Sequence, residues 1–262
     1  MGFVKTEEEI ERIEAALGAP RFGAAQLLSV EFRSDPDFIA AVLPPPLEPL
    51  QPASMRAMVG RWESNCVGDF EGGTVYVGAQ YEGVVGEYQL SQYIDRDPAT
   101  IFGREVFGEP KKYGRAGLLR RGQHFRGWID SGGVRLLEIE GEMDTDRGPF
   151  TATGYSYNFK SRSAADGRGL QEDAILTRMT MEVRATTSLA GAAAMKLRGG
   201  AHDPLDEIPV ESLTRATYLE ADLSASGKAV ASTPADVFAP YHYGRNYDWS
   251  ALNTEAAGPA WR

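Results

Sequence analysis

Partial alternation of apolar and polar residues dominates the chain from residue 74 onward. Six segments carry β-branched and aromatic side chains in this pattern, and glycine-rich turns separate them. The predicted strands are residues 74–81, 85–94, 118–128, 134–143, 175–186 and 215–223. Several antiparallel strands with few helices favour a closed or nearly closed barrel, so the expected fold class is mainly β (α+β).

Three short helical segments accompany these strands. Thr6 and Glu9 form a capping-box pattern ahead of an acidic amphipathic stretch, which predicts a peripheral helix within residues 1–19. Two further helices are expected, at residues 36–43 and, capped by Asp95 or Asp97, at residues 97–107. The helix at residues 97–107 leads directly into a loop that carries two lysines.

Composition limits the classes of protein that the chain can represent. It has 262 residues, which we interpret as a single domain over 1–262 with an aromatic C-terminal tail at 240–262, packed on the barrel or on a neighbouring subunit. A net charge of −10 argues against a nucleic-acid partner. The acidic N-terminus and the lack of an apolar run of about 18 residues argue against secretion and membrane insertion, which favours the cytoplasm.

Cysteine and histidine usage points away from metal chemistry. Cys66 is the only cysteine, so neither an intramolecular disulfide nor a cysteine metal cage is expected, and a buried thiol is the simplest interpretation. His124, His202 and His242 lack the spacing of metal ligands. We therefore predict no metal and no other cofactor.

Two adjacent lysines, Lys111 and Lys112, are the strongest chemical signal in the chain. They follow Pro110 and lie close to the apolar residues Val106 and Phe107. A lysine with its unperturbed pKa of about 10.4 is a poor nucleophile at neutral pH, but a neighbouring cation or an apolar pocket disfavours the charged form. The free amine attacks a ketone to form a Schiff base, whose iminium accepts electrons when a carbon–carbon bond breaks or forms.

The wider sequence around the lysines resembles the acetoacetate decarboxylase family. The resemblance spans roughly residues 20 to 225 in the expected order. Its blocks are the segments FRSD (32–35) with LPPPLE (43–48), GVVGEY (83–88), YID (93–95), GREVFGEPKK (103–112) and DPLDEIPV (203–210). It implies a β-barrel whose interior holds the reactive lysine, Lys111 as the Schiff-base residue, Lys112 as its electrostatic neighbour, and a homo-oligomer.

The chain departs from the family pattern at the polar positions. Glu109 stands where typical members carry an aromatic residue, and the family's arginine and one of its glutamates fall on Ala25 and Gly72. A carboxylate beside an amine moves protons, which aldol and dehydration steps require. We assign proton transfer to Glu109 or Glu71. Residues proposed to bind substrate or to rebuild the missing polar set are Arg61, Glu63, Asp69 and Phe107.

Three functions are compatible with this sequence. The first is a Schiff-base lyase of the aldolase or aldolase–dehydratase kind, joining pyruvate or a similar 2-oxo acid to an aldehyde. The second is a true acetoacetate decarboxylase whose carboxylate-binding groups have moved. The third is a barrel that binds a small ligand without catalysis. Lys111 is central to the first two and has little purpose in the third.

Overall fold

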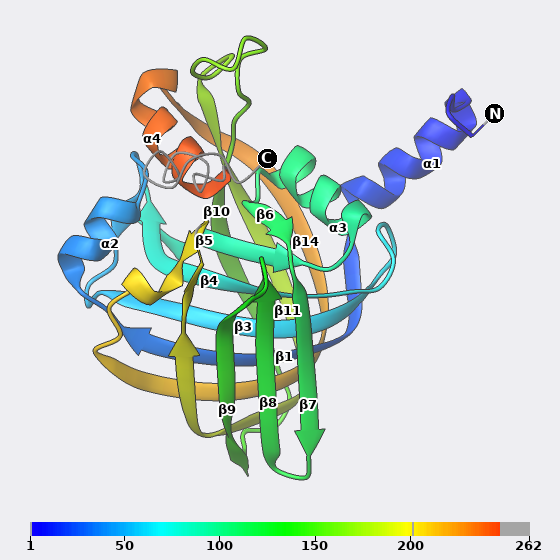
Figure 1. Ribbon diagram of the computed structural model, residues 1–262. Coiled ribbons are helices and arrows are strands. Elements are labelled where there is room, and N and C mark those ends of the chain that lie inside the picture. The colour runs from blue at the N-terminus through cyan, green and yellow to red at the C-terminus, as the bar shows by residue number, and fades with distance from the viewer. Residues whose placement is uncertain (1, 201, 247–262) are drawn as a thin grey trace, which may run out of the picture.

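The computed structural model describes residues 2–200 and 202–246, and seven of its strands close into a barrel (Figure 1). Neighbouring strands follow the order β10-β5-β4-β3-β1-β14-β11, and pairing of β10 with β11 closes the ring. All these pairings are antiparallel except β10 with β5, so the barrel is mixed and not purely antiparallel. The strands are β1 (Arg21–Arg33), β3 (Ser54–Ser64), β4 (Phe70–Tyr81), β5 (Val84–Ile94), β10 (Phe150–Lys160), β11 (Ala174–Leu197) and β14 (Ser212–Thr233).

A second layer of sheet packs against the outside of the barrel. It contains β7 (Arg115–Arg121), β8 (His124–Ser131) and β9 (Val134–Asp146). Strand β11 is long enough to serve both parts, because its first half pairs with β10 and its second half pairs with β9. The main hydrophobic core fills the space between the layers and includes Leu28, Val59, Phe125 and Ile129.

The helices lie at the periphery of the barrel (Figure 1). The Thr6–Glu9 capping box is confirmed, and the helix that it starts has no buried residue. Asp35 caps the second helix by accepting a 2.8 Å hydrogen bond from the Phe38 backbone. The helices are α1 (Glu7–Gly18), α2 (Pro36–Val42), α3 (Asp97–Phe102) with its π-helical continuation η1 (Gly103–Phe107), the 3-10 turn η2 (Leu205–Glu207) and α4 (Ala235–Asn246).

The predicted cap of the third helix is wrong. Arg96 occupies the N-cap position of α3 and makes no side-chain capping bond. Asp95 instead accepts a 2.8 Å hydrogen bond from the backbone of Glu71, which fixes the end of β5 against β4. The Asp95 carboxylate therefore binds the neighbouring strand and does not cap the helix, although the local sequence pattern predicted that it would.

The strand predictions differ from the structure in two respects. Residues 118–128 form a hairpin, because Gly122 turns the chain with a φ of +64°. Strands β1, β3 and β10 were not predicted. Both faces of β1 and β3 are largely buried, one toward the barrel interior and one toward the second layer, so their sequences lack clear alternation.

Four further strands are short: β2 (Glu48–Pro49), β6 (Lys111–Tyr113), β12 (Gly199–Gly200) and β13 (Asp203–Pro204).

Three other expectations concern single residues and segments. Cys66 was predicted to be buried, but it is only half-buried and contacts Ser64. Within residues 2–200 and 202–246 no helix is both long and apolar enough to cross a membrane. Of the aromatic tail predicted at 240–262, Tyr247 and Trp249 lie outside the described residues.

Candidate active site

The segment from α3 to β6 delivers the lysine pair to one end of the barrel. The π-helix η1 ends at Gly108, which has a φ of +76° and whose amide donates back to the carbonyl of Gly103. A Cβ atom at position 108 would lie 2.5 Å from the backbone nitrogen of Lys160, so only glycine fits there. The chain then passes through Glu109 and Pro110 into β6, which pairs in parallel with the end of β5.

Lys111 is buried, with 6% of its side chain exposed. Its Nζ atom lies 2.9 Å from Oε2 of Glu109 and donates a 3.0 Å hydrogen bond to the carbonyl of Ala99 in α3. The Phe70 ring centre is 5.8 Å from the same nitrogen. The amine thus sits between one carboxylate, one carbonyl and an aromatic face, away from bulk water.

Glu109 connects the lysine to a further polar side chain. Its Oε1 atom accepts a 3.2 Å hydrogen bond from the Nε2 atom of Gln89 on β5. Gln89 also contacts the hydroxyl of Ser156 on β10 at 3.5 Å, and its own Oε1 atom has no hydrogen-bond partner in the part of the chain that the structure describes. The result is a buried chain of polar groups, Gln89–Glu109–Lys111, with a spare acceptor at its far end.

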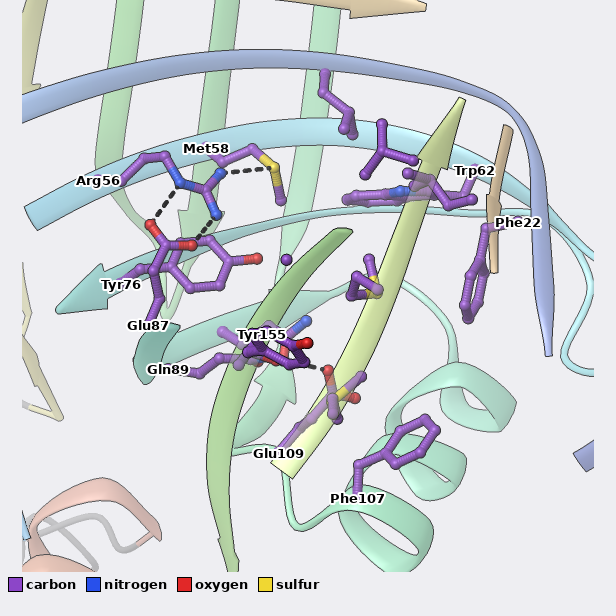
Figure 2. A pocket seen from close by; sticks show the side chains of 18 of the residues that line it. Phe22, Arg56, Met58, Trp62, Tyr76, Glu87, Gln89, Phe107, Glu109 and Tyr155 are labelled. Atoms are coloured by element: carbon purple, nitrogen blue, oxygen red, sulfur yellow. Dashed lines mark hydrogen bonds and ion pairs between the residues drawn. The ribbon is translucent and has the colours of Figure 1, made fainter. Parts of the chain in front are cut away.

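These groups face a cavity of about 250 Å³ in the barrel interior (Figure 2). Residues from all seven barrel strands contribute to its lining, and most of that lining is apolar. Phe107, which the sequence proposes as a substrate-binding residue, lies at its wall and packs edge to face against Phe102. Met179 and Met181 also line it. Further side chains of the lining are Arg56, Met58, Trp62, Phe70, Tyr76, Glu87 and Tyr155.

Lys112 does not lie beside Lys111 as its predicted electrostatic neighbour. Successive residues of a strand point to opposite faces, and β6 sends Lys112 to the outside of the barrel. There its Nζ atom forms a 2.6 Å ion pair with Asp203 and a 3.1 Å hydrogen bond to the carbonyl of His202. It lines a separate cavity, so its charge is balanced away from the reactive amine.

The polar residues proposed near the start of the barrel also face away from the cavity. On β3, Arg56, Met58 and Trp62 point inward, so Arg61 and Glu63 have the opposite parity and are exposed. Their neighbours on the next strand follow the same rule: Phe70 and Tyr76 line the cavity, whereas Glu71 does not and Asp69 is exposed. Burial and the nearby Asp95 carboxylate raise the pKa of Glu71, but this group does not reach Lys111.

Sequence reasoning missed the polar groups that do line the cavity. Arg56 forms a bidentate ion pair with Glu87 of β5, and its guanidinium lies 4.1 Å from the centre of the Tyr76 ring. The alternation of side chains along a strand could have identified Arg56, because Arg56, Met58 and Trp62 are separated by even numbers of residues and so share one face.

Alternation does not explain why Gln89 and Gln92, three residues apart, share a face. A β-bulge opposite Val75 and Tyr76 shifts the register of β5 and brings both glutamines to the cavity.

No group of three or more metal-ligating side chains occurs among residues 2–200 and 202–246. Each carboxylate that faces the cavity is paired with a cationic side chain. Glu109 pairs with Lys111, and Glu87 pairs with Arg56. The arrangement is suited to amine and proton chemistry carried by side chains.

Comparison with known proteins gives one consistent result. The family profile described as acetoacetate decarboxylase matches residues 10–234. An acetoacetate decarboxylase of Burkholderia cenocepacia is 27% identical over 213 residues, covering 79% of this chain and 86% of the relative.

Solved structures share the fold at lower identity. Acetoacetate decarboxylase from Legionella pneumophila superposes with a TM-score of 0.75 at 22% identity, covering 82% of this chain and 88% of that one. The enduracididine biosynthesis enzyme MppR, solved in complex with pyruvate, superposes with a TM-score of 0.69 at 16% identity, covering 81% and 90%. These similarities concern the fold alone, because each structure is less than 25% identical to this chain.

Proposed function

The chain belongs to the acetoacetate decarboxylase family, and from this premise we propose that it is a Schiff-base lyase that joins a small 2-oxo acid such as pyruvate to an aldehyde. One observation carries the proposal: the Glu109 carboxylate lies 2.9 Å from the Lys111 amine inside a mostly apolar cavity. Members of the family are lyases, and MppR is a family-fold enzyme that has been solved with pyruvate.

The first step needs a neutral amine and a carbonyl. Glu109 is the nearest base that can take the proton which the Lys111 ammonium must lose. The amine then adds to the keto carbon of the oxo acid, and the carbinolamine loses water to give the iminium. Burial of Lys111 protects the product of this step, because bulk water would otherwise return the iminium to the ketone.

The second step needs a base at the carbon beside the iminium. Glu109 removes a proton from the methyl group, and the electron pair moves to nitrogen to form the enamine. The enamine carbon attacks the aldehyde, and protonated Glu109 returns its proton to the new alkoxide. A second deprotonation expels the hydroxyl as water in the dehydratase variant, and hydrolysis of the iminium frees the product and Lys111.

The position of Glu109 separates this chemistry from simple decarboxylation. Loss of carbon dioxide forms the enamine directly from a 3-oxo acid and requires no base at the neighbouring carbon. In decarboxylation Glu109 would serve only as the base that takes the proton of Lys111, whereas aldol chemistry also uses it at the carbon beside the iminium in every turnover. Gln89 supports this role because its amide donates to Glu109 and fixes the orientation of the carboxylate.

Acetoacetate decarboxylation is the second candidate, and the names of the curated relatives favour it. Both candidates form the iminium on Lys111, and they differ in how that iminium becomes an enamine. Homo-oligomer formation, which the resemblance implies, is compatible with either and is part of the proposal.

Trapping the iminium distinguishes the candidates. The protein is incubated with pyruvate, and separately with acetoacetate, then treated with borohydride and mapped by mass spectrometry. We expect a pyruvate adduct on Lys111 and aldehyde-dependent consumption of pyruvate. An adduct with acetoacetate alone, together with carbon dioxide release, would replace aldol chemistry by decarboxylation. No adduct with either substrate would contradict both.

A further inference from the structure

A second group of polar side chains, the Arg56–Glu87 ion pair, lies in the same cavity as Lys111 but apart from it. We call this pair the second pole, and Lys111 with Glu109 the first. Arg56 of β3 donates from Nε to Oε1 of Glu87 at 2.8 Å and from Nη2 to Oε2, with the Tyr76 ring beneath its guanidinium. Figure 2 shows these three side chains together, away from Glu109 and Phe107. Burial opposes the charge of Arg56, but Glu87 raises the pKa of Arg56 above its ordinary value, so the guanidinium stays charged.

The reaction at Lys111 does not use this pair. Its hydrogen bonds run between Arg56 and Glu87 and to Met58, whereas the chain at the lysine runs through Gln89 and Glu109. The pair is only partly buried, with 22% of the Arg56 side chain and 32% of the Glu87 side chain exposed, and such a pair contributes little net stability because desolvation and solvent screening offset the attraction. Charged side chains inside a cavity are instead typical of a site that recognises a ligand.

One edge of the Arg56 guanidinium is poorly satisfied. Among the described residues, its Nη1 atom donates only to the thioether sulfur of Met58, at 3.4 Å. A thioether is a weak acceptor on a flexible side chain, so an oxygen of a ligand would displace it readily. The pair therefore offers a donor at Nη1 and unused lone pairs on the Glu87 carboxylate, which together suit a group that both accepts and donates.

Aromatic side chains line the part of the cavity next to Lys111. The Trp62 ring stacks on Phe70 with ring centres 5.0 Å apart, and Phe70 in turn lies 5.8 Å from the Lys111 nitrogen. The cavity of about 250 Å³ corresponds to roughly eight water-sized volumes, more than the six non-hydrogen atoms of pyruvate require. The remaining space has aromatic walls and fits a flat apolar body.

We propose that Arg56 and Glu87 determine the acceptor, recognising a neutral hydroxyl group at the far end of an aromatic aldehyde whose carbonyl carbon meets the enamine on Lys111. A second carboxylate is disfavoured at this pole because Glu87 already neutralises Arg56 and would repel it. An aromatic aldehyde without a polar substituent makes no hydrogen bond to the pair, so the Nη1 atom of Arg56 keeps its weak contact with the Met58 thioether. The inference rests on the proposed aldol function and names its substrate class.

The test compares three aldehydes with one ring: benzaldehyde, 4-hydroxybenzaldehyde and 4-carboxybenzaldehyde, each with pyruvate. We expect kcat/KM for the hydroxylated aldehyde to exceed that for benzaldehyde about tenfold, as for one well-made hydrogen bond to a charged group. The double variant R56M/E87M should reduce this ratio to about twofold or less while borohydride still traps pyruvate on Lys111. Replacing both partners avoids an unpaired buried charge.

A matched control is D130N/R135M, which removes a bidentate pair of β8 and β9 outside the cavity and should leave the ratio unchanged. Calorimetry with the unreactive alcohols 4-hydroxybenzyl, benzyl and 4-carboxybenzyl alcohol measures recognition without catalysis. Absence of a pyruvate adduct in the unmodified protein would contradict the proposed function. The relative affinities of the three alcohols would still test whether Arg56 and Glu87 recognise a hydroxyl group. Tightest binding of the carboxylated alcohol, or a preference that survives in R56M/E87M, would overturn it.

Discussion

The Oε2 atom of Glu109 lies 2.9 Å from the Nζ atom of Lys111, and neither side chain is more than 7% exposed. The two residues flank a tight turn that is closed by a 2.8 Å hydrogen bond from the Lys111 amide to the Glu109 carbonyl, and both side chains line the cavity inside the barrel. The single residue between them, Pro110, has no amide hydrogen to satisfy in this buried turn. The pair is therefore built by local geometry and completed by Gln89 from β5.

Glu109→Gln should separate iminium formation from turnover. The amide keeps the size of the side chain and a hydrogen bond to Lys111, but it cannot accept the proton of the substrate methyl group. We expect kcat for pyruvate plus aldehyde to fall by about 10²- to 10⁴-fold, the usual contribution of a general base, while borohydride still traps pyruvate. Steady-state kinetics and adduct mapping measure the two steps.

The control for this variant is Glu105→Gln, which changes an exposed glutamate of η1. It should leave kcat within about twofold, as expected for a surface substitution. Unchanged turnover in Glu109→Gln would remove this carboxylate from the reaction.

Gly103→Ala should disturb the site without changing a functional group. A Cβ atom at position 103 would collide with Oε2 of Glu109 and would lie 2.5 Å from Nζ of Lys111. Either the ion pair or the π-helix must shift, and overpacking of this kind costs about 1–3 kcal/mol. We expect a lower unfolding midpoint in urea and a loss of adduct formation at Lys111.

Gly18→Ala is the matched control, because nothing lies within 4 Å of a Cβ atom at the end of α1. It should leave both the unfolding midpoint and trapping at Lys111 unchanged. Full trapping in Gly103→Ala would show that the lysine tolerates displacement of its carboxylate.

The sequence predicted the barrel and proposed Lys111 as the Schiff-base residue, but it did not predict the direction of the side chains. Lys111 and Glu109 were identified because their spacing is local. Lys112 was misplaced because adjacency in sequence was taken for adjacency in space, although neighbouring residues of a strand face opposite sides.

Arg56 and Glu87 were missed for a related reason. They come from strands far apart in the chain, and they meet only when β3, β4 and β5 pair in one register. Strand β3 itself was not recognised, because burial of both its faces removes the alternation that marks a strand. Without that register, the exposed Arg61 and Glu63 were indistinguishable from inward-facing residues.

Lys112→Met should reduce stability more than it reduces chemistry. The substitution leaves Asp203 buried without its 2.6 Å partner, at a cost of about 3 kcal/mol or less given its partial exposure. The pH dependence of pyruvate trapping at Lys111 should stay the same, because the two ammonium groups face different cavities. Chemical denaturation and trapping across pH 6 to 9 measure these quantities.

The double variant Lys112→Met with Asp203→Asn should recover most of the lost stability, since it also removes the unpaired charge. A large shift in the pH profile of trapping in Lys112→Met would restore the electrostatic role that the sequence suggested for this residue.

His242 should make the fold sensitive to mild acid. Serines hold both of its ring nitrogens, Ser161 at 2.8 Å from Nδ1 and Ser163 at 3.0 Å from Nε2, and the side chain is 3% exposed. Burial, with the nearby Arg245 and Arg104, lowers its pKa to about 4. The unfolded chain, with a histidine pKa of about 6.5, therefore binds one more proton between these two values.

The free energy of unfolding should accordingly be highest, as far as His242 contributes, above pH 6.5. It should fall as the pH drops toward 4, with a loss of up to about 3 kcal/mol from this residue. Urea denaturation at pH 7, 6, 5 and 4.5 measures the slope. His242→Gln keeps hydrogen-bonding groups that do not titrate, so its slope should be smaller by the contribution of one proton. Equal slopes in the two proteins would show that His242 is not the group that titrates.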